Sequence, residues 1–187
     1  VLNSRYKEKN FGGYLGINKN WGYSHLVFSS FAQQAAIIEG ERDAISGKFL
    51  MYAGTVDEHE ATTDELNSRD MFTPFQKINH IKIASDNNFI LPKGRLTVNI
   101  GYQNNLRKEI GNYLNTSIPD LFFDLKTYNY NVQYHLPVKN NFKTSIGVNG
   151  MYQTNENKAE EVLIPEYNLF DVGMFIFSQK TVKKTTF

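Results

Sequence analysis

Apolar and polar residues alternate strictly over three neighbouring stretches of the chain, at residues 95–107, 122–136 and 142–153. In the first stretch, the even-numbered residues are mostly apolar and the odd-numbered residues are polar. The apolar set is Leu96, Val98, Ile100, Tyr102 and Leu106, and the polar set is Thr97, Asn99, Gly101, Gln103, Asn105 and Arg107. Because successive side chains of a strand point to opposite faces, each stretch predicts a β-strand with one apolar and one polar face.

Four further stretches alternate less strictly, at residues 11–18, 22–33, 76–91 and 167–180. Together the seven stretches predict an all-β chain of about seven long strands. The 21 Asn, 14 Phe and 11 Tyr of the 187 residues agree with this prediction. Asn is unfavourable inside helices, whereas aromatic side chains favour strands.

The connections between these stretches are alternately short and long. The short ones cover residues 18–22, 92–94 and 137–141, and the long ones cover about 34–75, 110–121 and 154–166. Antiparallel strands with tight turns at one end and long loops at the other are typical of an up-and-down barrel. In a transmembrane barrel the short turns are periplasmic and the long loops are extracellular.

The side chains on the polar face of the predicted strands indicate what lies on each side of the sheet. They are mainly Asn, Gln, Thr, Ser and Gly, which suit a hydrated or plugged lumen, so the apolar face is expected to meet lipid. The residues expected to face the lumen are Asn99, Gln103, Arg107, Asn129, Asn131, Gln133 and Asn149. Trp21, Tyr23, Tyr102 and Tyr152 are expected near the membrane interfaces as aromatic girdles.

The connection at about 34–75 is acidic. Residues 39–70 hold nine acidic and three basic side chains, a net charge of −6, which leaves +7 for the rest of the chain. We expect an extracellular loop here, with the residues nearest to a ligand being Glu39, Glu41, Arg42, Asp43 and His59. Thr62, with Glu65 three positions later, predicts a capping box at the start of a short helix.

Several classes of function find no support in the sequence. The net charge of +1 does not favour nucleic acid as a partner, and the absence of Cys excludes disulfides and thiol chemistry. The longest uncharged apolar run, residues 172–177, is far below the roughly 18 residues of a membrane-spanning helix. The four His lie far apart, and no catalytic or metal-binding constellation is recognisable. We therefore expect neither enzymatic activity nor a cofactor.

Several motifs, in order and over about residues 10–180, give the chain a family resemblance. They are Tyr23-Ser24-His25-Leu26, Ile38-Glu39-Gly40-Glu41-Arg42-Asp43, Pro74-Phe75-Gln76-Lys77-Ile78-Asn79-His80, Asp86-Asn87-Asn88-Phe89, Gly101-Tyr102-Gln103-Asn104, Val148-Asn149-Gly150-Met151 and Leu163-Ile164-Pro165-Glu166-Tyr167. In these motifs the chain resembles the β-barrel of TonB-dependent outer-membrane receptors of the Bacteroidetes type.

The resemblance implies an active-transport receptor in the outer membrane of a Gram-negative bacterium. Such receptors import a scarce nutrient, here an iron–siderophore or similar metal chelate. They are energised by the TonB–ExbB–ExbD complex acting through a plug domain, and a surface lipoprotein is a further partner that the resemblance allows. The chain has no plug-like segment, and a plugged barrel needs about 22 strands. Residues 1–187 are therefore expected to be an internal fragment of one transmembrane barrel domain.

Two alternatives remain open from the sequence. One is a small, stand-alone outer-membrane barrel with an anchoring or structural role. The other is a soluble β-sandwich that serves as a binding module, with its apolar face turned inward.

Overall fold

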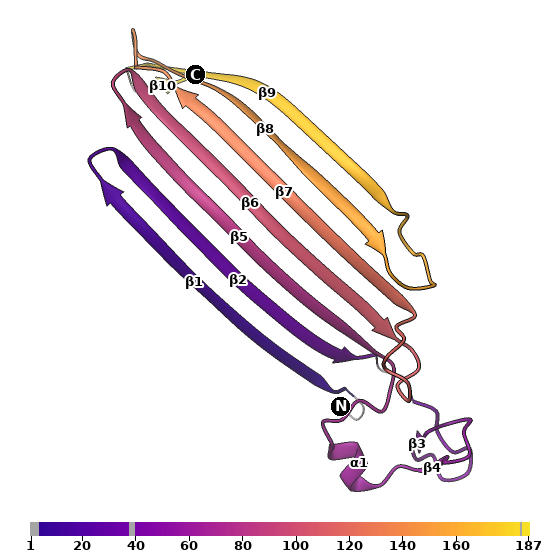
Figure 1. Ribbon diagram of the computed structural model, residues 1–187. Coiled ribbons are helices and arrows are strands. Elements are labelled where there is room, and N and C mark those ends of the chain that lie inside the picture. Colours follow the sequence, from indigo (N-terminus) through magenta and orange to yellow (C-terminus); the bar gives the residue numbers. More distant parts are fainter. Residues whose placement is uncertain (1–3, 38–39, 184) are drawn as a thin grey trace.

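The computed structural model describes residues 4–37, 40–183 and 185–187, and in it the chain is all-β. Seven long strands follow one another, and each pairs antiparallel with the next long strand in the chain (Figure 1). They are β1 (Tyr6–Lys19), β2 (Gly22–Ala36), β5 (Phe75–Leu91), β6 (Gly94–Ile110), β7 (Leu121–His135), β8 (Phe142–Asn157) and β9 (Tyr167–Val182). A two-residue strand, β10 (Thr185–Thr186), adds to β9 and makes an eight-stranded sheet.

The sheet is open, since β1 and β9 do not pair with each other in the described part of the chain. The expected antiparallel, up-and-down order of about seven long strands is confirmed. Each long strand has 14 to 17 residues, and all of them except β7 are longer than the corresponding alternating stretch of the sequence. In β1 the extra residues come before the alternating stretch, where Tyr6 to Asn10 pair with β2 although they show no apolar alternation.

The turns gather at one end of the sheet and the long connections at the other, as expected (Figure 1). The β1–β2 turn ends at Gly22, whose φ of +128° would be strained for any residue with a side chain. The β7–β8 turn has Asn140 and Asn141 at φ 51° and 62°, the left-handed pair that a tight hairpin needs.

The register of the sheet separates two faces. On the apolar face, Val98 of β6 lies beside Val132 of β7, which lies beside Val148 of β8 and then Met174 of β9. On the polar face, Asn99 of β6, Asn131 of β7 and Asn149 of β8 lie side by side. The alternation read from the sequence is therefore confirmed as two chemically different faces of one sheet.

Four aromatic side chains on the apolar face form a row across β6 to β9, which we call the aromatic row. Its members are Tyr102, Tyr128, Tyr152 and Phe170. The ring centroids of Tyr102 and Tyr128 are 4.8 Å apart, and those of Tyr128 and Tyr152 are 6.4 Å apart. The expected girdle residues Tyr102 and Tyr152 thus lie in one row.

The other two expected girdle residues lie elsewhere. Trp21, in the β1–β2 turn, stacks on Phe89 with ring centroids 5.7 Å apart. Tyr23 stacks on His25 and lies on the polar face, so its expected place in a lipid-facing girdle is wrong. The reason is parity, because Gly22 pairs with Phe89 on the apolar face and Tyr23 therefore points to the opposite side.

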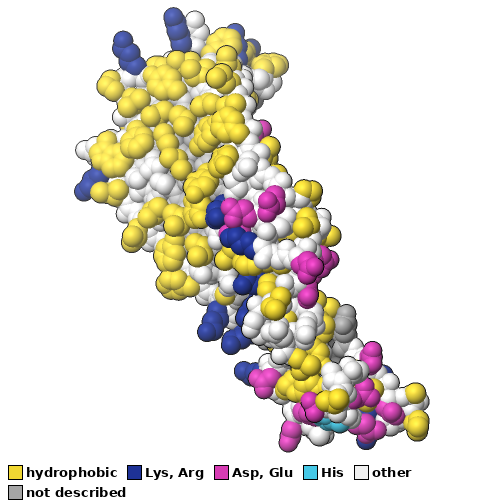
Figure 2. All heavy atoms as spheres, turned by 45° about the vertical axis from the view of Figure 1, so that its right-hand side comes forward, with side chains coloured by type: hydrophobic (Ala, Val, Ile, Leu, Met, Phe, Trp, Pro, Cys, Tyr) yellow, Lys and Arg dark blue, Asp and Glu magenta, His cyan; other side chains and the backbone are white. Residues whose placement is uncertain are grey.

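Beyond the aromatic row, towards the long loops, the same face becomes charged. Asp124 is 4% exposed and accepts a hydrogen bond from Asn104, while Lys126 and Lys158 both pair with its carboxylate. Figure 2 shows hydrophobic side chains over the part of the sheet near the short turns and acidic and basic side chains nearer the loops.

The buried hydrophobic side chains lie at the long-loop end of the sheet. Among the described residues they are Met51, Phe75, Ile110, Leu121 and Phe123, each 7% exposed or less. By contrast, large apolar side chains on the face near the turns are open, with Met174 87% and Ile176 77% exposed. The only helix that the structure describes, α1 (Thr63–Asn67), is too short to span a membrane.

Candidate ligand-binding site

The long connection between β2 and β5 folds into a small unit of its own, which we call the loop module (residues 40–74). It contains α1 and a short two-stranded sheet of β3 (Leu50–Met51) and β4 (His59–Glu60), and it lies at the long-loop end (Figure 1). The expected boundaries of about 34–75 are too wide at the start, because β2 continues to Ala36.

The first turn of the loop module is built by Asp43. Its Oδ1 accepts hydrogen bonds from the backbone N–H of Ile45 at 3.0 Å and of Ser46 at 2.6 Å. The bond from Ser46, followed by that from Ile45, lowers the pKa of the Asp43 carboxyl. Oδ1 of Asp43 is thus used to close the turn of its own segment.

Arg42 is held within the same turn. Its guanidinium donates to the Gly47 carbonyl at 2.7 Å and lies 3.8 Å from the centroid of the Phe49 ring. Next to it, Lys48, just before β3, and Glu60 of β4 form an ion pair at 2.5 Å. The structure thus gives Arg42 and Asp43, both expected near a ligand, contacts that hold the loop module together.

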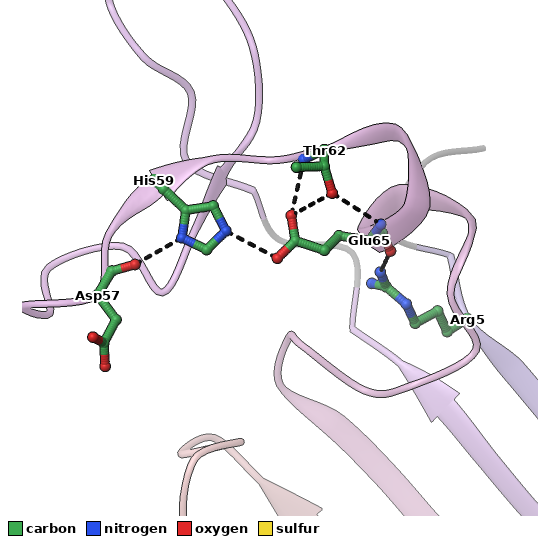
Figure 3. Close-up of polar contacts among 5 residues, drawn as sticks. All are labelled: Arg5, Asp57, His59, Thr62 and Glu65. Carbon is green, nitrogen blue, oxygen red and sulfur yellow. Dashed lines mark hydrogen bonds and ion pairs between the residues drawn. The ribbon is translucent and has the colours of Figure 1, made fainter.

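His59 links β4 to the start of α1 (Figure 3). Its Nδ1 lies 2.8 Å from the Asp57 carbonyl, and its Nε2 lies 2.9 Å from Oε1 of Glu65. Because the protonated ring can donate to both oxygens, the Asp57 carbonyl and then Glu65 raise the pKa of His59.

Thr62 and Glu65 form the capping box that the sequence predicts. Oγ1 of Thr62 accepts a hydrogen bond from the N–H of Glu65, and Oε2 of Glu65 accepts one from the N–H of Thr62 at 2.9 Å. The bond from the Thr62 backbone, then that from its hydroxyl, lowers the pKa of Glu65 to about 2. Glu65 therefore remains a carboxylate at any ordinary pH.

Arg5 ties the loop module to the start of β1. Its guanidinium donates to the carbonyl of Glu65 at 2.6 Å (Figure 3). The same guanidinium donates to the carbonyl of Ser68, just after α1, at 3.1 Å. It also lies 5.1 Å from the centroid of the Phe72 ring. A cation at the carboxyl end of a helix is electrostatically favourable, so this contact fixes α1 against the sheet.

A pocket of about 460 Å³ lies between the loop module and the connection that follows β6. Its apolar lining comes mainly from Leu50, Met51, Phe72 and Pro74. The lining residues with polar side-chain groups are Glu41, Thr73 and Tyr113. Residues 111–120 belong to a different connection, so the pocket exists only because two long loops meet at the same end of the sheet.

The wall of the pocket is continuous with an aromatic cluster. Tyr52 adopts a positive φ of 53°, and its ring lies 6.2 Å from that of Phe72 and 6.1 Å from that of Tyr113. Burial raises the pKa of the Tyr113 hydroxyl, which stays protonated. The His59 ring, 5.7 Å from that of Tyr52, joins this cluster but does not line the pocket.

Thr73 is the most unusual residue of the pocket. It is 7% exposed, and its hydroxyl has no hydrogen-bond partner within the described chain. Buried hydroxyls are nearly always paired, because losing water without gaining a partner costs free energy. Such a group is a reason to look for a ligand in the pocket that it lines.

Of the five loop residues expected near a ligand, only Glu41 lines this pocket. Glu39 lies outside the described residues, while Arg42, Asp43 and His59 have contacts within the loop module. Thr73 and Tyr113 were missed, because their role depends on the meeting of two loops far apart in sequence. The one available signal was the alternation of connections, which places both loops at the same end.

The seven residues expected to face a lumen all lie on the polar face. Gln133 donates to Asn131 at 3.1 Å, and Arg107 pairs with Glu109 at 2.5 Å. The others are Asn99, Gln103, Asn129 and Asn149, on β6, β7 and β8. The register brings them together on one face of the sheet, and none of them lines the loop pocket. Whether a lumen lies there stays a prediction.

Comparisons with models of protein families, with curated proteins and with solved structures find no match to this chain.

Proposed function

We propose that the chain is part of the wall and outer loops of an outer-membrane transport receptor of the TonB-dependent type. The observation that carries this proposal is the division of one face of the sheet into an open apolar zone, an aromatic row and a charged zone, in that order from the turns to the loops. A membrane barrel needs this sequence of zones on its outer surface.

The dimensions of the apolar zone support the proposal. From the turn to the aromatic row it takes nine residues in β6 (94–102) and eleven in β8 (142–152). A tilted strand needs about 9–11 residues to cross the hydrocarbon core. The remainder of each strand would extend outwards, which agrees with the Asp124 cluster and the buried residues lying there.

The exposure of apolar side chains also supports a lipid environment. Phe11 and Leu15 on β1 and Phe170 on β9 are 67–73% exposed, and Met174 and Ile176 on β9 are still more open. So many large apolar side chains open on one face of a sheet are rare on soluble monomers. The second sheet that a β-sandwich would need is absent from the described residues, because β3 and β4 belong to the loop module. The soluble alternative is therefore less well supported.

The open edges of the sheet favour a large barrel over a small stand-alone one. Within residues 4–37, 40–183 and 185–187, β1 pairs with neither β9 nor β10, so the sheet does not close. A wall of seven long strands would be completed by further strands to about 22, around a plug that the polar face would meet. On this proposal the TonB–ExbB–ExbD complex supplies energy through that plug, and the cargo is an iron–siderophore or similar metal chelate.

Uptake measurements on the whole protein would test the function. A strain lacking the gene should lose energy-dependent uptake of a radiolabelled metal chelate, and restoring the gene should recover it. Removing TonB in the complemented strain should abolish uptake again, which separates active transport from passive leakage. Unchanged uptake of every metal chelate tested in the deletion strain would contradict the proposal.

A further inference from the structure

The loop pocket has one charged residue among those that line it, and that residue is Glu41. The two basic side chains nearest to it in sequence are already engaged, Arg42 with the Gly47 carbonyl and Lys48 with Glu60. Residues 40–70 carry eight acidic and three basic side chains. The electrostatic field at the pocket therefore favours a positive ligand and opposes a negative one.

The walls of the pocket point to the same charge. Phe72 and Tyr113 line it, and Tyr52 packs between their rings at about 6 Å from each. Aromatic faces attract cations. The guanidinium of Arg5 already lies 5.1 Å from the centroid of the Phe72 ring and opposes a second cation there, so the attraction for a ligand cation comes from the Tyr113 ring and Glu41. Leu50, Met51 and Pro74 complete an apolar lining suited to a hydrocarbon body.

Thr73 supplies an independent indication that something binds here. Its hydroxyl is buried without a partner in the described chain, in the lining of the same pocket. The oxygen has almost no accessible surface, so a ligand can pair with it only if the Thr73 side chain turns towards the pocket. An acidic loop alone would not identify a site, but an unpaired buried hydroxyl in the lining of the same pocket is a second, independent observation.

We propose that this pocket binds an organic cation with an apolar or aromatic body: Glu41 and the Tyr113 ring attract the charge, Phe72 packs against the body, and Thr73 supplies a hydrogen-bonding group. The inference rests on the proposed function in one respect: if the ligand is the cargo, the imported chelate is cationic rather than anionic. Binding itself requires no transport, so it can be measured separately.

The test uses the whole protein, purified in detergent, and three probes with one naphthalene skeleton. The probes are 2-naphthylmethylamine (cationic), 2-naphthalenemethanol (neutral) and 2-naphthoate (anionic), with affinities measured by calorimetry or fluorescence. We expect the amine to bind at least about tenfold more tightly than the carboxylate, with the alcohol between them. Equal or tighter binding of the carboxylate would overturn the proposal.

Two variants locate the binding and distinguish it from a structural role. Glu41→Gln should lower the affinity for the amine about tenfold and change the affinity for the alcohol less than twofold. The matched control is Asp64→Asn, which removes a charge of the loop module outside the pocket. Thr73→Val should weaken the amine and the alcohol several-fold without lowering the melting temperature, because the lost hydroxyl has no partner to leave behind. Equal effects of Glu41→Gln and Asp64→Asn, or unchanged affinity in Thr73→Val, would contradict the proposal.

Membrane insertion is scored independently on the same sample, by the heat-dependent mobility of the folded barrel on a gel. If the protein does not insert into the membrane but binds the probes in the expected order of affinity, the proposed function is wrong and the pocket assignment stands. If the protein inserts but binds the probes in another order, only the pocket assignment is wrong.

Discussion

Thr62 fixes the start of α1 through a pair of hydrogen bonds with Glu65, and α1 in turn is attached to β1 by Arg5. We predict that Thr62→Ala lowers the local stability of this segment by about 1 kcal/mol, the usual contribution of an N-cap hydroxyl. Backbone amides of residues 63–67 should then exchange about fivefold faster in hydrogen-exchange measurements.

Thr63→Ala is the matched control for that prediction. Thr63 is exposed, is the first residue of α1, and takes no part in the capping box. Equal exchange rates in the two variants would mean that the box does not hold the helix start.

His59 gives the loop module a defined pH dependence. Because its pKa is raised, its stabilising effect is fully present below pH 6.5 and is lost as the pH rises through the folded-state value. Glu65 has its pKa lowered to about 2, so its contribution is present above about 4.5 and is lost as the pH falls towards 2. We predict the greatest resistance of the loop module to proteolysis between about pH 4.5 and 6.5. A His59 pKa at or below 6.5 by NMR titration would contradict this.

At the residue scale, the sequence predicted contacts between side chains whose hydrogen-bond partners lie only a few residues away. The Thr62–Glu65 box follows from a three-residue spacing and is confirmed. Arg42 and Asp43 were correctly placed in the loop, but their partners are carbonyl, N–H and aromatic groups of their own turn. Composition identifies polar loop residues and does not show whether their hydrogen bonds are already used.

At the scale of the element, the central claim about each strand concerns which face meets lipid. We predict that Ile100→Lys, on the apolar face of β6, lowers the stability of the inserted protein by about 2–4 kcal/mol near the bilayer midplane. The measurement is the folded fraction in lipid vesicles along a denaturant series.

Asn99→Lys is the control, because it adds the same charge one residue earlier on the polar face. Val132→Lys and Asn131→Lys repeat the comparison on β7. If the lysines at the two Asn positions are the more harmful pair, the assignment of the faces is inverted.

Strand positions were predictable because alternation has a period of two, which turns and register preserve in the folded sheet. The ends of the strands were not. The first residues of β1 are largely charged or polar and become a strand only by pairing with β2, as in Tyr6 opposite Ala35. The face on which Tyr23 lies was also not predicted, because a shift of one residue along a strand moves a side chain to the other face.

At the scale of the whole molecule, the sequence predicted the meander and the end at which long connections gather. It did not predict the loop pocket, because Thr73 and Tyr113 come from separate connections that meet only in the folded chain. The buried core at the loop end was also beyond the sequence pattern, which carries no information on how two loops pack together.

The most direct test of the account is the sidedness of the two ends of the sheet. The chain has no Cys, so single cysteines can be placed at two exposed sites, Val56 in the loop module and Val138 in the β7–β8 turn. In intact cells carrying the whole protein without other cysteines, a membrane-impermeant thiol reagent should label Val56→Cys, and Val138→Cys should be labelled only after the outer membrane is permeabilised. Equal labelling of both sites in intact cells, or labelling of Val138→Cys alone, would contradict a membrane-spanning wall with outward-facing loops.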